Sequence, residues 1–241
     1  MPIKDKPAKT LELGDRWAQL IEIHNHAKAI FLLAEEFDPK SKDFIQPPME
    51  LRHALEHIIR AQAVLLGISN GGDTPTGELE YVQHSFDKAI GHEYRAFFDA
   101  ADWLSVSIRT RIVETLNPYS HECIEVVIPD YYPTLRPRVD QSCHKIAAIR
   151  GAKDVARNLD IKARVGKSKE TIAEVGGYQK IIAELLDIDE KIHDSIPAMI
   201  DWKKKNYRSA FWKWFLRVVG GGIIVAVVSA YILDWMGFFK S

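Results

Sequence analysis

Residues 211–239 read FWKWFLRVVGGGIIVAVVSAYILDWMGFF, and this stretch decides which architecture we expect of the whole chain. Residues 218–233 carry no charged side chain, and with the flanking aromatic residues the apolar stretch extends from Phe215 to Phe239. A helix of about 20 mostly apolar residues crosses a hydrocarbon core of about 30 Å. We therefore expect a C-terminal transmembrane helix over residues 210–239. The alternative interpretation is a very apolar helix buried in a protein core.

The ends of this stretch carry residue types that anchor membrane helices. Arg217 can extend its charge to the lipid surface, and Asp234 lies near the far end. Tryptophans lie where the aromatic belt of a membrane helix lies, at Trp212, Trp214 and Trp235.

Charge predicts the orientation of the helix. Between Asp201 and Asp234 every charged side chain is basic, and only Lys240 lies beyond the span. Basic residues favour the cytoplasmic side, so we expect a cytoplasmic N-terminal head and a C-terminus outside. The first residues, MPIKDKPAKT, lack the apolar run of a secretory signal. The basic residues before the span are Lys203, Lys204, Lys205, Arg208, Lys213 and Arg217.

Composition limits the function of the head. A formal net charge of −1 excludes a protein that coats nucleic acid generally, although a local basic pocket remains compatible with it. The two cysteines, Cys123 and Cys143, lack metal-binding spacing and are expected to be reduced cytosolic thiols. No glycine-rich phosphate loop, Ser-His-Asp pattern or tandem repeat is present. The sequence predicts no cofactor and no metal centre.

Apolar residues recur at helical spacing along nearly the whole head, so we expect an all-α fold. Helices are predicted over residues 11–37, from Pro47 to residue 68, and over residues 78–116, 139–159 and 167–209. Polar or glycine-rich segments separate them, at residues 38–43, 69–77 and 161–169. Residues 119–140 contain several prolines, and residues 124–128 are predicted to form one short strand. The predicted domains are a cytoplasmic bundle over 1–166, a helical stalk over 167–209 and the transmembrane helix over 210–239.

The predicted stalk carries a heptad pattern. Such a seam buries against another helix, either within the same head or on a second chain, and the sequence leaves both open. Pro197 is expected to kink the helix near its end. One position of the heptad holds Tyr178, Leu185, Ile192 and Met199, and the companion position holds Ile181, Ile188 and Trp202.

Small residues within the predicted span favour association of several copies. Gly222, Ala226 and Ala230 recur every four residues on one face, where they would let helix backbones approach closely. The run Gly220-Gly221-Gly222 lowers helix propensity and can act as a hinge. In an oligomer, a ring of Asp234 at a pore mouth would favour cations. Glycine and alanine are also simply common in membrane helices, and Asp234 alone can reach water.

Polar residues form stripes on two neighbouring predicted helices. Because a short loop joins these helices, antiparallel packing would let the two stripes face each other or line one groove. Three interpretations remain: a site for an anion or nucleotide, a structural network that includes Glu93, and an ordinary solvated face. The stripes hold Arg52, His53, Glu56, His57 and Arg60, then His84, Lys88, His92, Arg95, Asp99 and Asp102.

The run from Arg52 to His57 resembles the R-x4–6-H motif of HEPN domains, with His53 at the polar position after the arginine. The resemblance covers residues 47–116 and implies an all-helical domain whose motif helix meets its copy in a dimer. In the ribonuclease members it implies that Arg52 stabilises phosphate charge and that His57 is the acid or base, without metal. Arg138 and His144 satisfy the loose spacing too, but an apolar residue follows the arginine.

The layout of a helical head and one membrane span resembles bacterial antiviral membrane effectors, including accessory membrane proteins of some CRISPR systems and the membrane channel of the Hailong defence system. The resemblance implies a homo-oligomeric channel, a tetramer or similar ring, in the bacterial inner membrane that depolarises infected cells. It also implies a nucleotide or oligonucleotide ligand made by a partner enzyme. The expected ligand-binding residues are Arg52, His53, His57, Arg60, Lys88, His92 and Arg95.

Two other functions are compatible with the sequence. One is a membrane-tethered HEPN-type ribonuclease using Arg52 and His57, and the other is a tail-anchored adaptor that brings a cytosolic partner to the membrane.

Overall fold

The computed structural model describes residues 7–37, 44–68, 77–157 and 168–235. Within these ranges the side chains of residues 7–12, 151–157, 168–172, 210, 220–226, 230 and 232–235 are not described. The described residues form helices and contain no strand, so the expected all-α class is confirmed. The predicted turn at 38–43, most of the loop at 69–77 and most of the linker at 161–169 lie outside the described residues.

The helices follow the local sequence signals closely. The second helix has proline in its first turn, where the missing N–H costs nothing, and the third begins after Gly77, whose φ of 79° suits glycine. Along the chain the elements are α1 (Pro7–Phe37), α2 (Gln46–Leu65), α3 (Glu78–Leu116), α4 (His121–Val127), the π-helical turn η1 (Tyr131–Leu135), α5 (Arg136–Arg157) and α6 (Ser168–Trp235).

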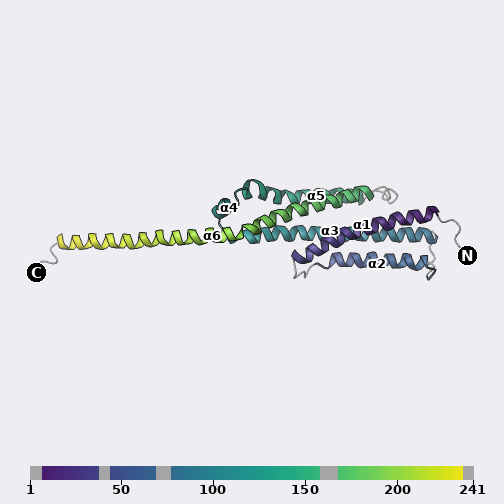
Figure 1. Cartoon of the computed structure of the whole chain (residues 1–241), viewed down its shortest axis with the longest axis horizontal. Coiled ribbons are helices and arrows are strands. Elements are labelled where there is room, and N and C mark those ends of the chain that lie inside the picture. Colours follow the sequence, from purple (N-terminus) through teal and green to yellow (C-terminus); the bar gives the residue numbers. More distant parts are fainter. Residues whose placement is uncertain (1–6, 38–43, 69–76, 158–167, 236–241) are drawn as a thin grey trace.

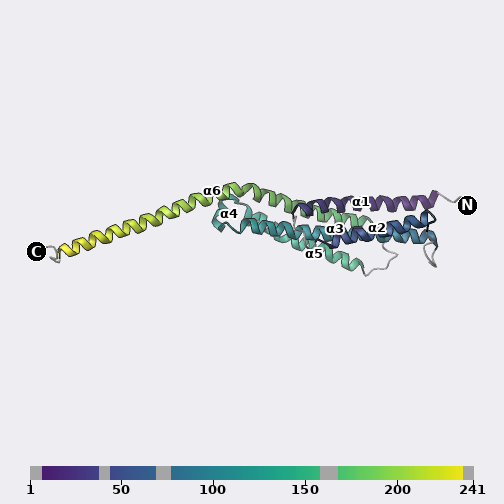
Figure 2. The same cartoon turned by 90° about the horizontal axis from the view of Figure 1, so that it is seen from below.

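Helix α3 is the central element of the head. In Figure 1 it lies between α2 on one side and α5 and α6 on the other, and it contacts α1, α2 and α6 (Figures 1 and 2). Large apolar side chains at helical spacing make it the core of the bundle. Those that are fully buried include Phe86, Phe97, Leu104, Ile108 and Ile112.

Alanines set how closely the helices approach. Ala54 and Ala61 of α2 are fully buried, as are Ala89, Ala96 and Ala100 of α3. A methyl side chain lets two helix axes come closer than leucine or phenylalanine does. The α2–α3 interface is therefore tight, and the polar residues beside these alanines are brought near the opposite helix.

The heptad seam of α6 packs within the chain. Tyr178, Leu185, Ile188, Ile192 and Met199 are all buried in the single-chain structure. Helix α6 contacts α3, α4 and α5, so the bundle itself supplies the surfaces that cover this seam. The helix continues through Pro197 and extends well beyond the rest of the bundle (Figure 2). Its 68 residues correspond to a length of about 100 Å.

An ion pair fixes α6 against α3. Arg111 Nη2 lies 3.1 Å from Asp189 Oδ2, and the Arg111 guanidinium also lies over the Phe37 ring at 4.8 Å. Asp189 is 3% exposed, and its other carboxylate oxygen is buried without a hydrogen-bond partner among the described residues. Burial raises the pKa of Asp189, although the charges of Arg111 and His193 oppose this. Keeping the Asp189 carboxylate ionised in this interface therefore lowers the stability of the folded state.

The predicted strand at residues 124–128 is wrong. Residues 121–127 form α4, and the Ser120 side chain caps it by accepting a hydrogen bond from the Cys123 backbone N–H at 3.2 Å. An N-terminal cap stabilises a helix by about 1 kcal/mol, which outweighs the weak strand preference of β-branched residues in so short a segment. Cys123 and Ile124 are buried, so packing against the bundle reinforces the helix.

Over the part of the chain that the structure describes, none of the helices offers a stretch both long and apolar enough for crossing a bilayer. The predicted span includes residues 220–226, 230 and 232–239, whose side chains lie outside the described ones. The predicted transmembrane helix therefore stays a prediction.

Replacing Asp189 by asparagine is expected to stabilise the protein at neutral pH, on the order of 1 kcal/mol. Asparagine still accepts a hydrogen bond from Arg111 but removes the buried charge. Because the folded-state pKa of Asp189 is raised, ionisation favours the unfolded state, and this cost is full above the folded-state pKa. The gain should therefore shrink as the pH falls through that pKa.

Thermal unfolding of the full-length protein in detergent at several pH values measures this difference. The exposed Asp187→Asn on the same helix is the matched control. A loss of stability in Asp189→Asn at pH 7 would show that the Arg111 ion pair outweighs the cost of burial.

Candidate functional site

A cluster of histidines lies in the α2–α3 interface. The His92 ring of α3 lies 5.3 Å from the ring centroids of both His53 and His57 of α2. The His57 ring is stacked on His92 with 22° between the planes, and the His53 ring is tilted at 59°. The polar stripes that the sequence places on these two helices therefore meet, but only over part of their length.

Glu50 is the anionic centre of this cluster. It is 8% exposed, and its Oε2 atom lies 2.6 Å from His92 Nδ1 and 2.9 Å from Arg95 Nε. Burial alone would raise the pKa of Glu50, but hydrogen bonds from Arg95 and His92 outweigh it and hold the pKa below its ordinary value. Glu50 is therefore an ionised carboxylate at neutral pH and balances part of the positive charge of α3.

Glu50 was missing from the sequence-predicted site, although a signal for it exists. It precedes His53 by three residues and His57 by seven, so all three lie on one face of α2. That face packs on α3, whereas Leu55 and Ile59 of the apolar face are more than half exposed. Binary patterning suggests the opposite orientation, with the apolar face inward.

The environment of His57 removes its positive charge. Burial, together with the positive charges of His92, Lys88 and Arg60, lowers the pKa of His57 to about 4. His57 is therefore a neutral imidazole at pH 7. A neutral imidazole can accept a proton or bind a metal ion, but it cannot attract an anion by charge.

The remaining predicted ligand-binding residues lie at the edge of the cluster. The Arg52 and Arg60 side chains are 70% and 58% exposed, and both flank Glu56, at 3.6 and 3.7 Å. Lys88 and His84 are exposed on α3. The exposed basic side chains Arg52, Arg60 and Lys88 thus lie at the surface. Arg95, in contrast, is paired with the buried Glu50.

The lower part of the α3 stripe belongs to another interface. Asp102 forms an ion pair with Arg150 of α5 and accepts a hydrogen bond from the Tyr178 hydroxyl of α6 at 3.0 Å. Asp102 therefore joins helices α3, α5 and α6 and does not face α2. Arg138, the arginine of the second loose motif, pairs with Glu184 at 2.7 Å, while His144 is exposed.

An apolar groove of about 480 Å³ lies between α1 and α2. Its base holds Glu93, whose Oε1 lies 3.1 Å from His24 Nδ1 and whose Oε2 is buried without a hydrogen-bond partner among the described residues. Burial raises the pKa of Glu93, and the His24 hydrogen bond opposes this. One interpretation of the sequence places Glu93 in an internal network. In the structure its partner is His24. The other residues lining the groove are Trp17, Leu20, Ile21, Leu51, Arg52, Leu55 and Ile58.

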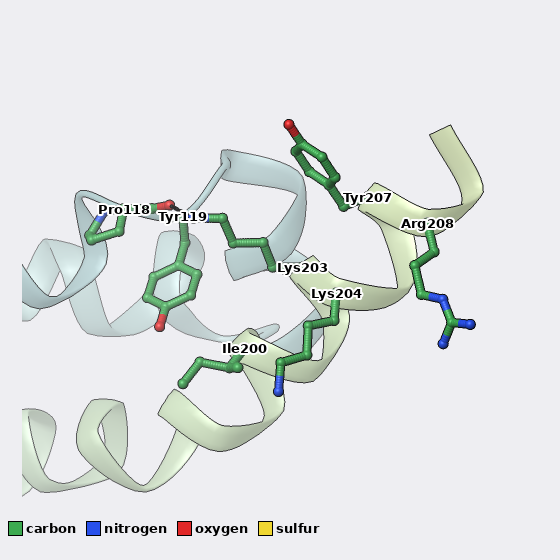
Figure 3. A pocket seen from close by; sticks show the side chains of 7 residues that line it. All are labelled: Pro118, Tyr119, Ile200, Lys203, Lys204, Tyr207 and Arg208. Atoms are coloured by element: carbon green, nitrogen blue, oxygen red, sulfur yellow. Dashed lines mark hydrogen bonds between the residues drawn. The ribbon is translucent and has the colours of Figure 1, made fainter. Parts of the chain in front are cut away.

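A second pocket, of about 560 Å³, lies where α6 leaves the bundle. Figure 3 shows residues of the α3–α4 connection facing residues of α6 across it. Lys203 Nζ donates a hydrogen bond to the Pro118 carbonyl at 3.2 Å and lies 5.8 Å from the Tyr119 ring centroid. The pocket is basic, and its lining residues are Pro118, Tyr119, Ile200, Lys203, Lys204, Tyr207 and Arg208.

The residues predicted for pore formation and oligomerisation have no described side chains. The backbone of α6 is helical at these positions, which fits the predicted small-residue face without testing it. They are Gly220, Gly221, Gly222, Ala226, Ala230 and Asp234.

Comparison with protein-family models, with curated proteins and with solved structures finds no match to this chain. The resemblance to HEPN domains and to antiviral membrane effectors therefore rests on the sequence pattern alone.

Replacing Glu50 by alanine is expected to destabilise the protein by on the order of 2 kcal/mol, because it leaves Arg95 and His92 without their buried anionic partner. Glu56→Ala, on the same helix but at a half-buried position, should change the free energy of unfolding by less than about 0.5 kcal/mol. Denaturant unfolding of both variants measures the difference. Equal effects would show that Glu50 does not organise the cluster.

Proposed function

We propose that this chain is a homo-oligomeric membrane effector, in which a helical cytoplasmic head controls a C-terminal transmembrane channel in response to an anionic ligand. One observation carries the proposal: α6 is a single helix whose first part is buried in the bundle core and whose second part extends away from it (Figure 1). A helix shared between the two parts can transmit a change in head packing directly.

The exposed side chains of the distal half of α6 support a membrane location. Among its described side chains, large apolar residues are exposed at most positions from 211 to 231, and so apolar a surface needs a lipid or protein environment. The basic residues at the head end, including Lys204 and Arg208 of the second pocket, would meet the anionic inner leaflet, where each contributes about 1 kcal/mol. The exposed apolar residues include Phe211, Trp212, Trp214, Phe215, Leu216, Val218, Val219, Val227, Val228 and Tyr231.

Self-association has support from two surfaces. Leu55 and Ile59 of α2 and its C-cap residue Leu66 are 54%, 58% and 69% exposed and follow one another at helical spacing, which suits contact with a second head. In the span, Gly222 and Ala226 offer a small-residue face for contact between membrane helices. Two contact regions, one in each compartment, would let a change in the head alter the packing of the pore.

The ligand site of this proposal is the basic surface around the histidine cluster. Arg52, Arg60 and Lys88 surround the cluster at the surface, and Arg95 lies closer to its centre. Such a surface suits phosphate groups, and Glu56, paired with Arg52 and Arg60, would give way to them. By analogy with antiviral effectors, the ligand would be a nucleotide made by a partner enzyme, and the response would be depolarisation of an infected bacterial cell.

Two arginines placed in the distal segment should abolish membrane insertion. Ile224→Arg with Val228→Arg adds a cost of about 2.5–3.5 kcal/mol per residue at the centre of a span. Flotation with liposomes should recover the wild-type chain but not this variant. The matched control is Val106→Arg with Val113→Arg, at exposed apolar positions of α3. A wild-type chain that stays soluble and monodisperse without detergent would contradict the proposal.

The sequence of the span should matter beyond its hydrophobicity. Replacing residues 215–235 with an unrelated apolar helix of the same length should preserve insertion but abolish ion flux in proteoliposomes, because the Gly222, Ala226 and Ala230 face is lost. A tail-anchored adaptor would keep its function after this exchange. Equal flux from both chains would contradict a channel built on that face.

A further inference from the structure

We propose that Glu50, His53 and His92 form a binding site for one divalent transition-metal ion, Zn²⁺ in the first instance. One potential ligand atom from each of these side chains lies within 4.8 Å of the other two. This inference goes beyond the proposed membrane function and does not depend on it, because every residue involved lies on α2 or α3 of the head.

The donor set fits zinc. Two imidazoles and one carboxylate are the ligands of many three-residue zinc sites, in which a water or substrate takes the fourth position. Mg²⁺ and Ca²⁺ prefer oxygen donors, so two histidines select against them. Zinc bonds of about 2.0–2.1 Å in tetrahedral geometry place ligand atoms about 3.3 Å apart, so small side-chain rotations complete the site.

The scaffold holds the three donors in place. Glu50 and His53 lie three residues apart on one face of α2, and His92 lies on α3 across the tight interface formed by the buried alanines. Glu50 is buried and both histidines are half-buried, so the donors are partly shielded from water. Two rigid helices therefore fix the site, and no loop contributes a ligand.

Without an ion, the hydrogen bonds of the cluster are incompatible with one another. His92 Nδ1 lies 2.6 Å from both Glu50 Oε2 and Arg95 Nη2. If Nδ1 carries a proton it can donate to Glu50 but faces an Arg95 donor, and if it does not, it faces the carboxylate oxygen. A metal ion bound between Glu50 and His92 would replace the proton shared by these two groups, and because a metal-bound nitrogen has no free lone pair, Arg95 Nη2 would then turn away from Nδ1.

Neighbouring side chains would support the bound ion. Arg95 Nε donates to Glu50 at 2.9 Å and would fix the orientation of the carboxylate, as supporting groups commonly do in metal sites. Its positive charge also weakens the attraction for a cation, so we expect moderate affinity. The stacked His57 ring closes one side of the site.

The test uses full-length protein without a histidine tag, in detergent, after removal of metal with a chelator. Isothermal titration with ZnCl₂ should give one ion per chain, and His53→Ala should weaken binding at least about tenfold. His84→Ala, at an exposed histidine of α3, is the matched control and should bind as the wild type does. MgCl₂ in excess should not compete.

Cobalt gives a second measurement that needs no variant. Co²⁺ bound to the wild-type chain should show the visible absorption of a tetrahedral site, and Zn²⁺ should displace it. Failure of the wild type to bind Zn²⁺ stoichiometrically, an octahedral Co²⁺ spectrum, or wild-type affinity in a folded His53→Ala would each overturn the proposal.

Discussion

Burial of the heptad seam of α6 is the constraint on which the rest of the structure depends. Tyr178, Leu185, Ile188, Ile192 and Met199 are almost completely withdrawn from water, and burial of such side chains contributes roughly 1.5–3 kcal/mol each. The bundle therefore fixes the direction in which α6 leaves it. Because α6 is one helix, a force on its distal half is transmitted to the core of the head.

The second constraint is the close approach of α2 and α3. Fully buried Ala54 and Ala61 leave no space for an apolar layer, so polar side chains beside them meet directly. Glu50 forms an ion pair with Arg95 in this interface and balances its charge. Leu55 and Ile59, on the other face of α2, are exposed. A helix that turns its polar face inward and its apolar face outward is typical of a protein with a site inside and a partner outside.

Much of the fold was predictable from the sequence. Helical periodicity, and the proline and glycine residues that mark the ends of helices, are local signals. Helix α3 lies where its pattern predicts it, from Glu78 to Leu116. Residues 121–127 were mispredicted because a Ser120 cap and tertiary burial override strand preference. The single-chain burial of the α6 seam could not be predicted, since the same heptad also suits a partner chain.

The candidate site was predictable only in part. The spacing of His53, His57 and His92 placed them on two polar stripes that could face each other or line one groove, and the structure brings their rings together. The sequence alone did not indicate Glu50, because a single glutamate near the start of a helix is usually solvated. The exposure of Arg52 and the separate role of Asp102 depend on which face of each helix packs, and this depends on long-range contacts.

We propose that α6 is one uninterrupted helix from the head into the membrane. Hydrogen–deuterium exchange of the full-length chain in lipid nanodiscs tests it most directly at residues 200–209, which join the buried and distal parts. A continuous helix predicts slow exchange through this segment, comparable with that of the neighbouring turns. Exchange at the rate of an unstructured peptide there would contradict the account, because head and distal segment would then be joined by a flexible linker.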